Sequence, residues 1–189
     1  MITVAVTLLL CISVFACGTS RELSVEYPPI DELLIDLSVF PEEWEATQPS
    51  FKHPPHAPWS GPGHLVEYVR QNFYSSSDLY TGVIVEIRRY DSGQSATREY
   101  ERRLEVVFRE DSYTWTTFPA VVHESTIADH ARYACSEVGC GYFARYGVYT
   151  YHCGVRIHDT DTITYTDLLP VLLQAIDGRM ALALDNGVE

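Results

Sequence analysis

The stretch "DHARYACSEVGCGYFARYGVYTYHCGVRI", residues 129–157, decides the fold. Three runs rich in tyrosine and valine are separated by two short breaks, "SEVG" and "YG". Aromatic and β-branched residues favour extended backbone, and short breaks that contain glycine are typical of hairpin turns. The stretch therefore predicts three consecutive antiparallel strands joined by two hairpins.

The two hairpins set the positions of the cysteines. If "SEVG" forms a four-residue loop, Cys135 lies opposite Cys140. If "YG" forms a two-residue turn, Cys140 also lies opposite Cys153, on the same face of the sheet. A disulfide between Cys135 and Cys140 is favoured, because a short loop is easily closed. The pair Cys140–Cys153 stays open as the alternative.

The same register places a row of tyrosines on the face that carries the cysteines. These residues are Tyr133, Tyr142, Tyr149 and Tyr151. A tyrosine row of this kind can line a ligand pocket. More often it forms an amphipathic core layer whose hydroxyls reach the rim of the core. Both interpretations remain open at this point.

Segments before and after this stretch complete the expected architecture. Residues 65–74 and 79–90 alternate as strands do, although residues 65–74 also fit a helical face. Residues 95–108 and 164–180 place apolar side chains at helical spacing, and residues 112–118 read as a further strand. The prediction is an α+β fold: a curved antiparallel sheet of about six strands, packed by a central helix and a C-terminal helix.

Composition limits the class of partner. The chain has 189 residues, a formal net charge of −13 and 46% hydrophobic residues, which indicates a folded and acidic protein. Phosphate-rich nucleic acid demands Lys and Arg, so nucleic acid is not expected as a partner. Residues 29–189 are long enough for a single domain with a real core. No cofactor is expected.

The N-terminal segment predicts export. Residues 2–16 carry no charged side chain and are short for a membrane-spanning helix, which needs about 20 residues. The segment resembles a bacterial lipoprotein signal, because Val14-Phe15-Ala16-Cys17 matches its pattern of an aliphatic, a variable and a small residue before cysteine. The resemblance implies a signal peptide over 1–17, acylated Cys17, and a tether over 18–28. An ordinary secretory signal and an uncleaved anchor remain open.

Further motifs carry a family resemblance. The order "DLSVFPEEW", "RRY", a charged helix, two cysteines, "CGYFARYG" and "DLLPVLLQAIDGRM" resembles a group of small bacterial lipoproteins of the Chloroflexota type. More distantly, the pattern of a curved sheet packed by helices is similar to the PsbP-like fold. That resemblance implies an accessory or binding protein at a membrane, and it brings no catalytic motif.

Histidines in a proline-rich loop provide the main alternative. Residues 49–64 contain five prolines and the histidines His53, His56 and His64. Neutral imidazole binds metals well, so this loop is the candidate for a metal binder or a metal-dependent envelope enzyme. Incidental histidines in an exposed loop are the simpler interpretation, and no metal ligand is assigned. His152 is likewise expected at the surface.

No catalytic motif is recognised in the sequence. Ser125 lies between two histidines in "HESTIADH", but spacing alone does not make a catalytic triad. The sequence therefore predicts a non-enzymatic, lipid-anchored protein on the outer face of the membrane, in the cell envelope. We expect it to bind a small ligand in a cleft between sheet and helix, or a protein of the envelope.

Overall fold

The structure is a computed structural model that describes residues 27–52, 64–76, 81–108, 121–136, 139–156 and 165–185. Cys17, the predicted signal peptide and nearly all of the predicted tether lie outside the described residues. So do His53, His56 and the strand predicted over residues 112–118.

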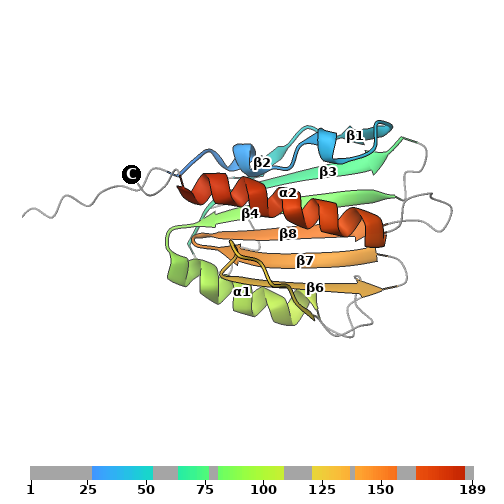
Figure 1. The fold of residues 1–189 in the computed structure, drawn as a ribbon. Helices are drawn as coiled ribbons and strands as arrows, with labels where there is room; N and C mark the ends of the chain where they lie inside the picture. Colours follow the sequence, from blue (N-terminus) through green and yellow to red (C-terminus); the bar gives the residue numbers. More distant parts are fainter. Residues whose placement is uncertain are drawn as a thin grey trace, which may run out of the picture.

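One antiparallel sheet organises the described chain. Its strands run in the order β1-β3-β4-β8-β7-β6-β5, and β2 pairs beside β1 on the outer edge of β3 (Figure 1). The strand bounds are β1 Trp44–Ala46, β2 Ser50–Lys52, β3 Leu65–Ser75, β4 Gly82–Tyr90, β5 Val121–Val122, β6 His130–Ser136, β7 Gly139–Tyr146 and β8 Tyr149–Arg156. The predicted α+β class with an antiparallel sheet is confirmed. The ambiguous segment 65–74 is a strand.

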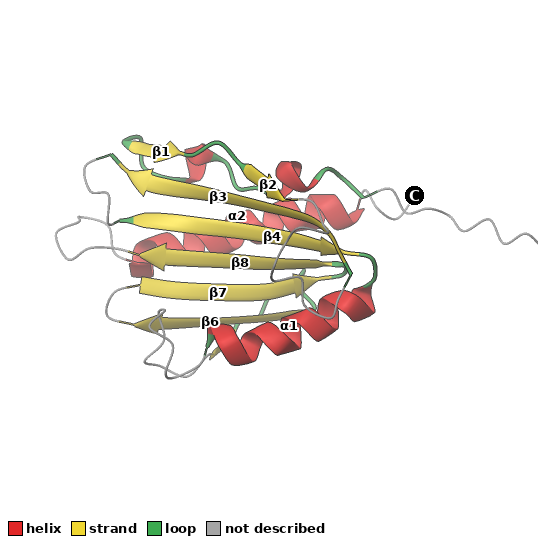
Figure 2. Cartoon of the chain, turned by 180° about the vertical axis from the view of Figure 1, so that it is seen from behind, coloured by secondary structure: helices red, strands yellow, loops and turns green. Residues whose placement is uncertain are grey.

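Helices lie on both faces of this sheet. The central helix α1 spans Gly93–Val107 and the C-terminal helix α2 spans Tyr165–Asp185. Figure 1 shows α2 in front of the sheet, whereas Figure 2, from behind, shows α1 in front and α2 beyond the strands. Two short 3-10 helices, η1 over Ile30–Leu33 and η2 over Leu37–Val39, precede β1. In the described part of the chain, no helix combines the length and hydrophobicity needed to cross a bilayer.

The hairpin between β7 and β8 corrects the predicted register. Its two-residue turn is Gly147-Val148, so Tyr146 pairs with Tyr149. Gly147 has φ 57°, a left-handed conformation that glycine adopts at no steric cost. The turn therefore lies one residue later than predicted. Cys153 faces Tyr142, and Cys140 faces Val155, so the prediction that Cys140 lies opposite Cys153 is wrong.

Side chains alternate between two faces, which we call the α2 face and the α1 face after the helix on each. Because the turn lies one residue later than predicted, each residue of β7 pairs with a β8 residue two positions further along. A shift of two residues keeps every side chain on the same face, so the faces predicted for the tyrosines are unchanged. The α2 face packs the apolar stripe of α2 against the sheet, and the members of that stripe, Leu169, Leu172, Leu173, Ile176 and Met180, are all buried as predicted. This layer is the main core.

Candidate functional site

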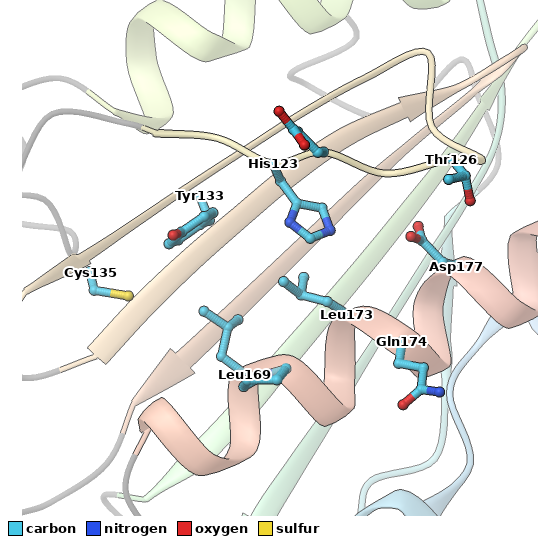
Figure 3. Close-up of a pocket in the computed structure, with 10 residues that line it drawn as sticks. His123, Thr126, Tyr133, Cys135, Leu169, Leu173, Gln174 and Asp177 are labelled. Carbon is cyan, nitrogen blue, oxygen red and sulfur yellow. The ribbon is translucent and has the colours of Figure 1, made fainter.

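A cavity lies between α2 and the segment formed by β5, residues 123–128 and β6 (Figure 3). We call it the α2 cavity. Its volume is about 610 Å³, which falls in the range of small-molecule sites. The lining residues are His123, Glu124, Thr126, Tyr133, Cys135, Leu169, Pro170, Leu173, Gln174 and Asp177.

Helix α2 supplies one wall of the cavity. Leu169, Leu173 and Asp177 follow one another at intervals of four residues, so they lie on one face of the helix. Figure 3 shows the two leucines and Asp177 along the side of α2 that faces the strands. The wall is therefore apolar along most of its length and ends in a carboxylate.

The opposite wall carries aromatic rings. The backbone N–H of His123 donates to the carbonyl of Ala131 at 3.0 Å, which holds the segment against β6. The His123 ring makes edge contacts with Tyr133 and Tyr142, with ring centroids 6.3 and 5.7 Å apart. Tyr133 is half-buried and lines the cavity. The site is thus a slot between aliphatic and aromatic side chains.

A chain of hydrogen bonds ties the two walls together. The hydroxyl of Ser125 donates to Asp177 Oδ2 at 2.8 Å, and the hydroxyl of Tyr146 donates to Asp177 Oδ1 at 2.6 Å. The Tyr142 and Tyr146 hydroxyls are 2.8 Å apart. Since the single proton of Tyr146 goes to Asp177, Tyr142 is the donor of that bond. Burial, foremost, raises the pKa of both tyrosines, which keeps both as donors.

Ser125 is a structural serine in this arrangement. Its oxygen accepts hydrogen bonds from the backbone N–H groups of Ile127 at 3.1 Å and Ala128 at 2.9 Å. Its proton goes directly to Asp177, whereas a catalytic serine gives its proton to a histidine base. The contact fixes residues 125–128 onto α2.

The four predicted ligand-lining tyrosines separate into two groups. Tyr133 lines the α2 cavity. Tyr142, Tyr149 and Tyr151 are fully buried in the core, which is the alternative that the sequence had left open. The Tyr149 and Tyr151 hydroxyls are buried without a hydrogen-bond partner among the residues that the structure describes.

Cys135 and Cys140 form a disulfide, the favoured of the two predicted pairs. The residues face each other in the β6–β7 register, with Cα atoms 4.0 Å apart. Cys135 also lines the α2 cavity, so the disulfide fixes one end of its strand wall. Cys153 is a free, fully buried thiol, and burial raises its pKa to about 12. A thiol in this state is unreactive.

The α1 face holds a second group of functional side chains, which we call the Glu86 cluster: Tyr68, Arg70, Glu86, Arg88 and His152. Tyr68 Oη donates to Glu86 Oε1 at 3.1 Å, and Arg88 Nη2 donates to Glu86 Oε2 at 3.1 Å. Arg70 Nη1 lies 3.7 Å from Glu86 Oε1. Arg88 also stacks on the Tyr68 ring, 5.0 Å from its centroid. A carboxylate thus organises two arginines within the sheet surface.

Burial decides the electrostatics of this cluster. The Glu86 side chain is 13% exposed and that of Arg88 is 6% exposed. Burial by itself raises the pKa of Glu86, but Arg88, His152, Tyr68 and Arg70 together hold it below its ordinary value. Glu86 is therefore ionised, as its buried arginine partner requires.

His152 is not at the surface, so the prediction for it is wrong. Its side chain is 19% exposed, with the ring against Phe143 at a centroid distance of 6.2 Å. Burial, foremost, lowers its pKa, although nearby Glu86 acts in the opposite direction. The sequence did not reveal the burial of His152, because β8 is covered on both faces and the alternation of its side chains does not mark one side as exposed.

The predicted histidine loop lies mostly outside the described residues, because residues 53–63 are not described. His64 is described, and its Nδ1 lies 3.2 Å from Asp91 Oδ2. Within the described ranges, no three His, Cys, Asp or Glu side chains converge as metal ligands.

Sequence reasoning missed His123, Leu173 and Asp177 as one site. One signal was present: Asp177 follows Leu173 by four residues and therefore interrupts the apolar stripe of α2. His123 carried no signal, because its position depends on how residues 121–128 fold back onto β6. In comparisons with known proteins, no family model matches the chain and no curated protein matches it.

Proposed function

We propose that this chain is a lipid-anchored binding protein of the cell envelope, whose α2 cavity holds a small, largely apolar ligand. The observation that carries the proposal is the cavity itself, about 610 Å³ in the cleft between the sheet and α2. Its walls combine leucine, proline and aromatic side chains with polar side chains such as Thr126, Gln174 and Asp177, and apolar walls with convergent polar groups are typical of ligand sites. The disulfide and the Ser125–Asp177 bond hold its walls in place, which lowers the entropy cost of binding.

The test uses a cavity-filling variant with a matched control on the same helix. Leu173→Trp places an indole in the cavity, whereas Val171→Trp adds the same group at a position that is 49% exposed. The probe is N-phenyl-1-naphthylamine, a neutral dye that fluoresces in apolar sites. We expect wild type and V171W to bind it equally and L173W to bind at least about tenfold more weakly.

Thermal unfolding checks that both variants are folded. Equal dye binding by L173W and V171W, with both proteins folded, contradicts a ligand site in the α2 cavity. Loss of binding in both variants points to a dye site on the exposed side of α2, which also contradicts it.

Anchoring through Cys17 is the second part of the proposal, and the resemblance of residues 14–17 to a lipoprotein signal supports it. The test is intact mass in detergent of full-length protein expressed in a lipoprotein-processing bacterium. We expect a chain that begins at acylated Cys17 and carries one thiol that alkylates only after denaturation, since Cys153 is buried. A chain that retains residues 1–16, or an unlipidated chain cut elsewhere, contradicts the anchor but leaves the cavity untouched.

A further inference from the structure

The acidic side chains that line the α2 cavity have no permanently charged basic counterpart among its described lining residues. Two of the lining residues, Glu124 and Asp177, are carboxylates, and none of the described lining residues is lysine or arginine. A ligand that places a carboxylate or phosphate here meets like charge without a compensating cation, which is costly in a partly dry site. A ligand with a cationic end meets the opposite situation.

Two arginines close in sequence to groups of the cavity are ion-paired with other residues. Arg179, two residues after Asp177 on α2, is ion-paired with Asp36. Arg145 is paired with Asp129 at 3.2 Å, and it belongs to the α1 face of β7. Neither side chain lines the cavity, so neither is placed to neutralise an anionic ligand there.

Hydrogen bonds already orient the Asp177 carboxylate. Each Asp177 oxygen accepts one hydroxyl hydrogen bond, from Tyr146 and from Ser125, and each carboxylate oxygen can accept a second. The rings of His123 and Tyr133 lie on the opposite wall, and tyrosine faces attract cations. The formal net charge of −13 adds a long-range attraction for cations to these local groups.

We propose that the α2 cavity selects amphiphiles with an apolar body and an ammonium end, and that Asp177 and Glu124 provide this selectivity. The inference rests on the proposed function, because it names the ligand class of the same cavity. The ammonium group lies at the Asp177 carboxylate and the rim carboxylate of Glu124, and the hydrocarbon lies between Leu169, Leu173 and Tyr133.

The test compares three probes of equal chain length, decylammonium, decanol and decanoate, below the concentrations at which they form micelles. Each displaces N-phenyl-1-naphthylamine from the full chain, or is titrated by calorimetry. We expect decylammonium to bind at least about tenfold more tightly than decanoate, with decanol between them.

Matched variants locate the selectivity. Glu124→Gln removes a charge from an exposed rim position, and Glu105→Gln removes one from an exposed position on α1. We expect E124Q to reduce the preference for decylammonium over decanol several-fold at low salt, and E105Q to leave it unchanged. Asp177→Asn, checked for folding by thermal unfolding, reduces the preference further.

The outcomes separate the two proposals. If decanoate binds as tightly as decylammonium, the selectivity proposal is overturned while the binding function stands. If E124Q and E105Q lower the preference equally, net charge and not the cavity sets the selectivity, which also overturns it. If none of the three probes binds, the proposed function itself fails.

Discussion

The two faces of the sheet belong to the same strands, but different interactions stabilise them. On the α2 face, β4 presents Val83, Val85 and Ile87, all fully buried against α2 and its neighbours. On the α1 face, the intervening position Glu86 and the next one, Arg88, form a buried ion pair. The first face gains from removing apolar surface from water, at about 25 cal/mol per Å². The second depends on every buried charge having its partner.

The two faces differ in how much stability a single substitution costs. Loss of a methylene from the α2 face leaves a cavity whose cost is graded by its volume. Loss of one charge from the α1 face leaves its partner buried and uncompensated, which is an abrupt cost. The α2 cavity lies over the α2 face, between the helix and residues 123–128.

The largest effect is expected from removing the centre of the Glu86 cluster. Glu86→Ala leaves Arg88 and Tyr68 without their acceptor, and we expect the free energy of unfolding to fall by about 3–5 kcal/mol. Denaturant unfolding measures this change. The control is Glu45→Ala, which removes a carboxylate paired with Tyr74 at an exposed site and should cost about 0.5 kcal/mol or less. Equal losses in the two variants contradict a buried cluster.

A double variant sharpens this first comparison. Glu86→Met together with Arg88→Met removes both charges and keeps similar volume. Replacing both partners of a buried ion pair with apolar residues is often neutral or stabilising. We expect the double variant to be more stable than E86A. A double variant that is clearly less stable than wild type would show that the ion pair contributes net stability.

The second-largest effect is expected from a substitution on the α2 face. Ile176 lies in the middle of the α2 stripe and is fully buried. Ile176→Ala removes three heavy atoms from that layer, and we expect a loss of about 3 kcal/mol in the free energy of unfolding. Leu182→Ala, on the same helix at a position 62% exposed, is the matched control and should change stability by about 0.5 kcal/mol or less. A loss in I176A close to that of L182A would mean that α2 is only loosely packed on the sheet.

A smaller effect is expected from the disulfide at the end of the α2 face. Cys135 and Cys140 are separated by five positions, and closing so short a loop lowers the entropy of the unfolded chain by an amount worth about 2 kcal/mol. The paired variant Cys135→Ser and Cys140→Ser should lose about that much, measured against oxidised wild type. Reduced wild type should unfold like the variant. Wild type that is equally stable with and without reductant would contradict the estimate.

The smallest effect is a dependence on pH that belongs to the α1 face. Burial holds the pKa of His152 below its ordinary value of 6.5, so the unfolded chain binds a proton that the folded chain does not. Stability therefore falls as pH drops from about 6.5 toward the lower folded pKa, by at most about 1.4 kcal/mol per pH unit for one proton. Glu86 acts in the same direction at lower pH: its folded pKa lies below 4.5, and its contribution is lost as pH falls through that folded value.

His152→Gln is the control for this pH profile, because glutamine does not titrate. We expect stability measured between pH 7.5 and about 5 to flatten in H152Q relative to wild type. A profile of unchanged slope would mean that His152 takes up its proton in the folded chain as easily as in the unfolded one.

Most of the fold followed from patterns local in the sequence. Alternating tyrosines and valines set the strands, and the spacing of Leu169, Leu172 and Ile176 set the buried side of α2. The short "SEVG" break set the pairing of Cys135 with Cys140. The one register error came from placing the turn at Tyr146-Gly147, whereas the structure has it at Gly147-Val148 with Gly147 in the left-handed conformation.

The candidate site followed from contacts that no local pattern contains. Ser125 and Asp177 are 52 residues apart, and Tyr146 and Asp177 are 31 apart. The Glu86 cluster joins side chains from β3, β4 and β8 in the same way. The sequence by itself determined the strands of the three-strand stretch, the two helices and the apolar stripe, and it favoured the observed disulfide, because turn chemistry and hydrophobic period act over a few residues. Only the tertiary structure decided which polar groups meet and where a cavity remains, because both depend on how distant segments pack.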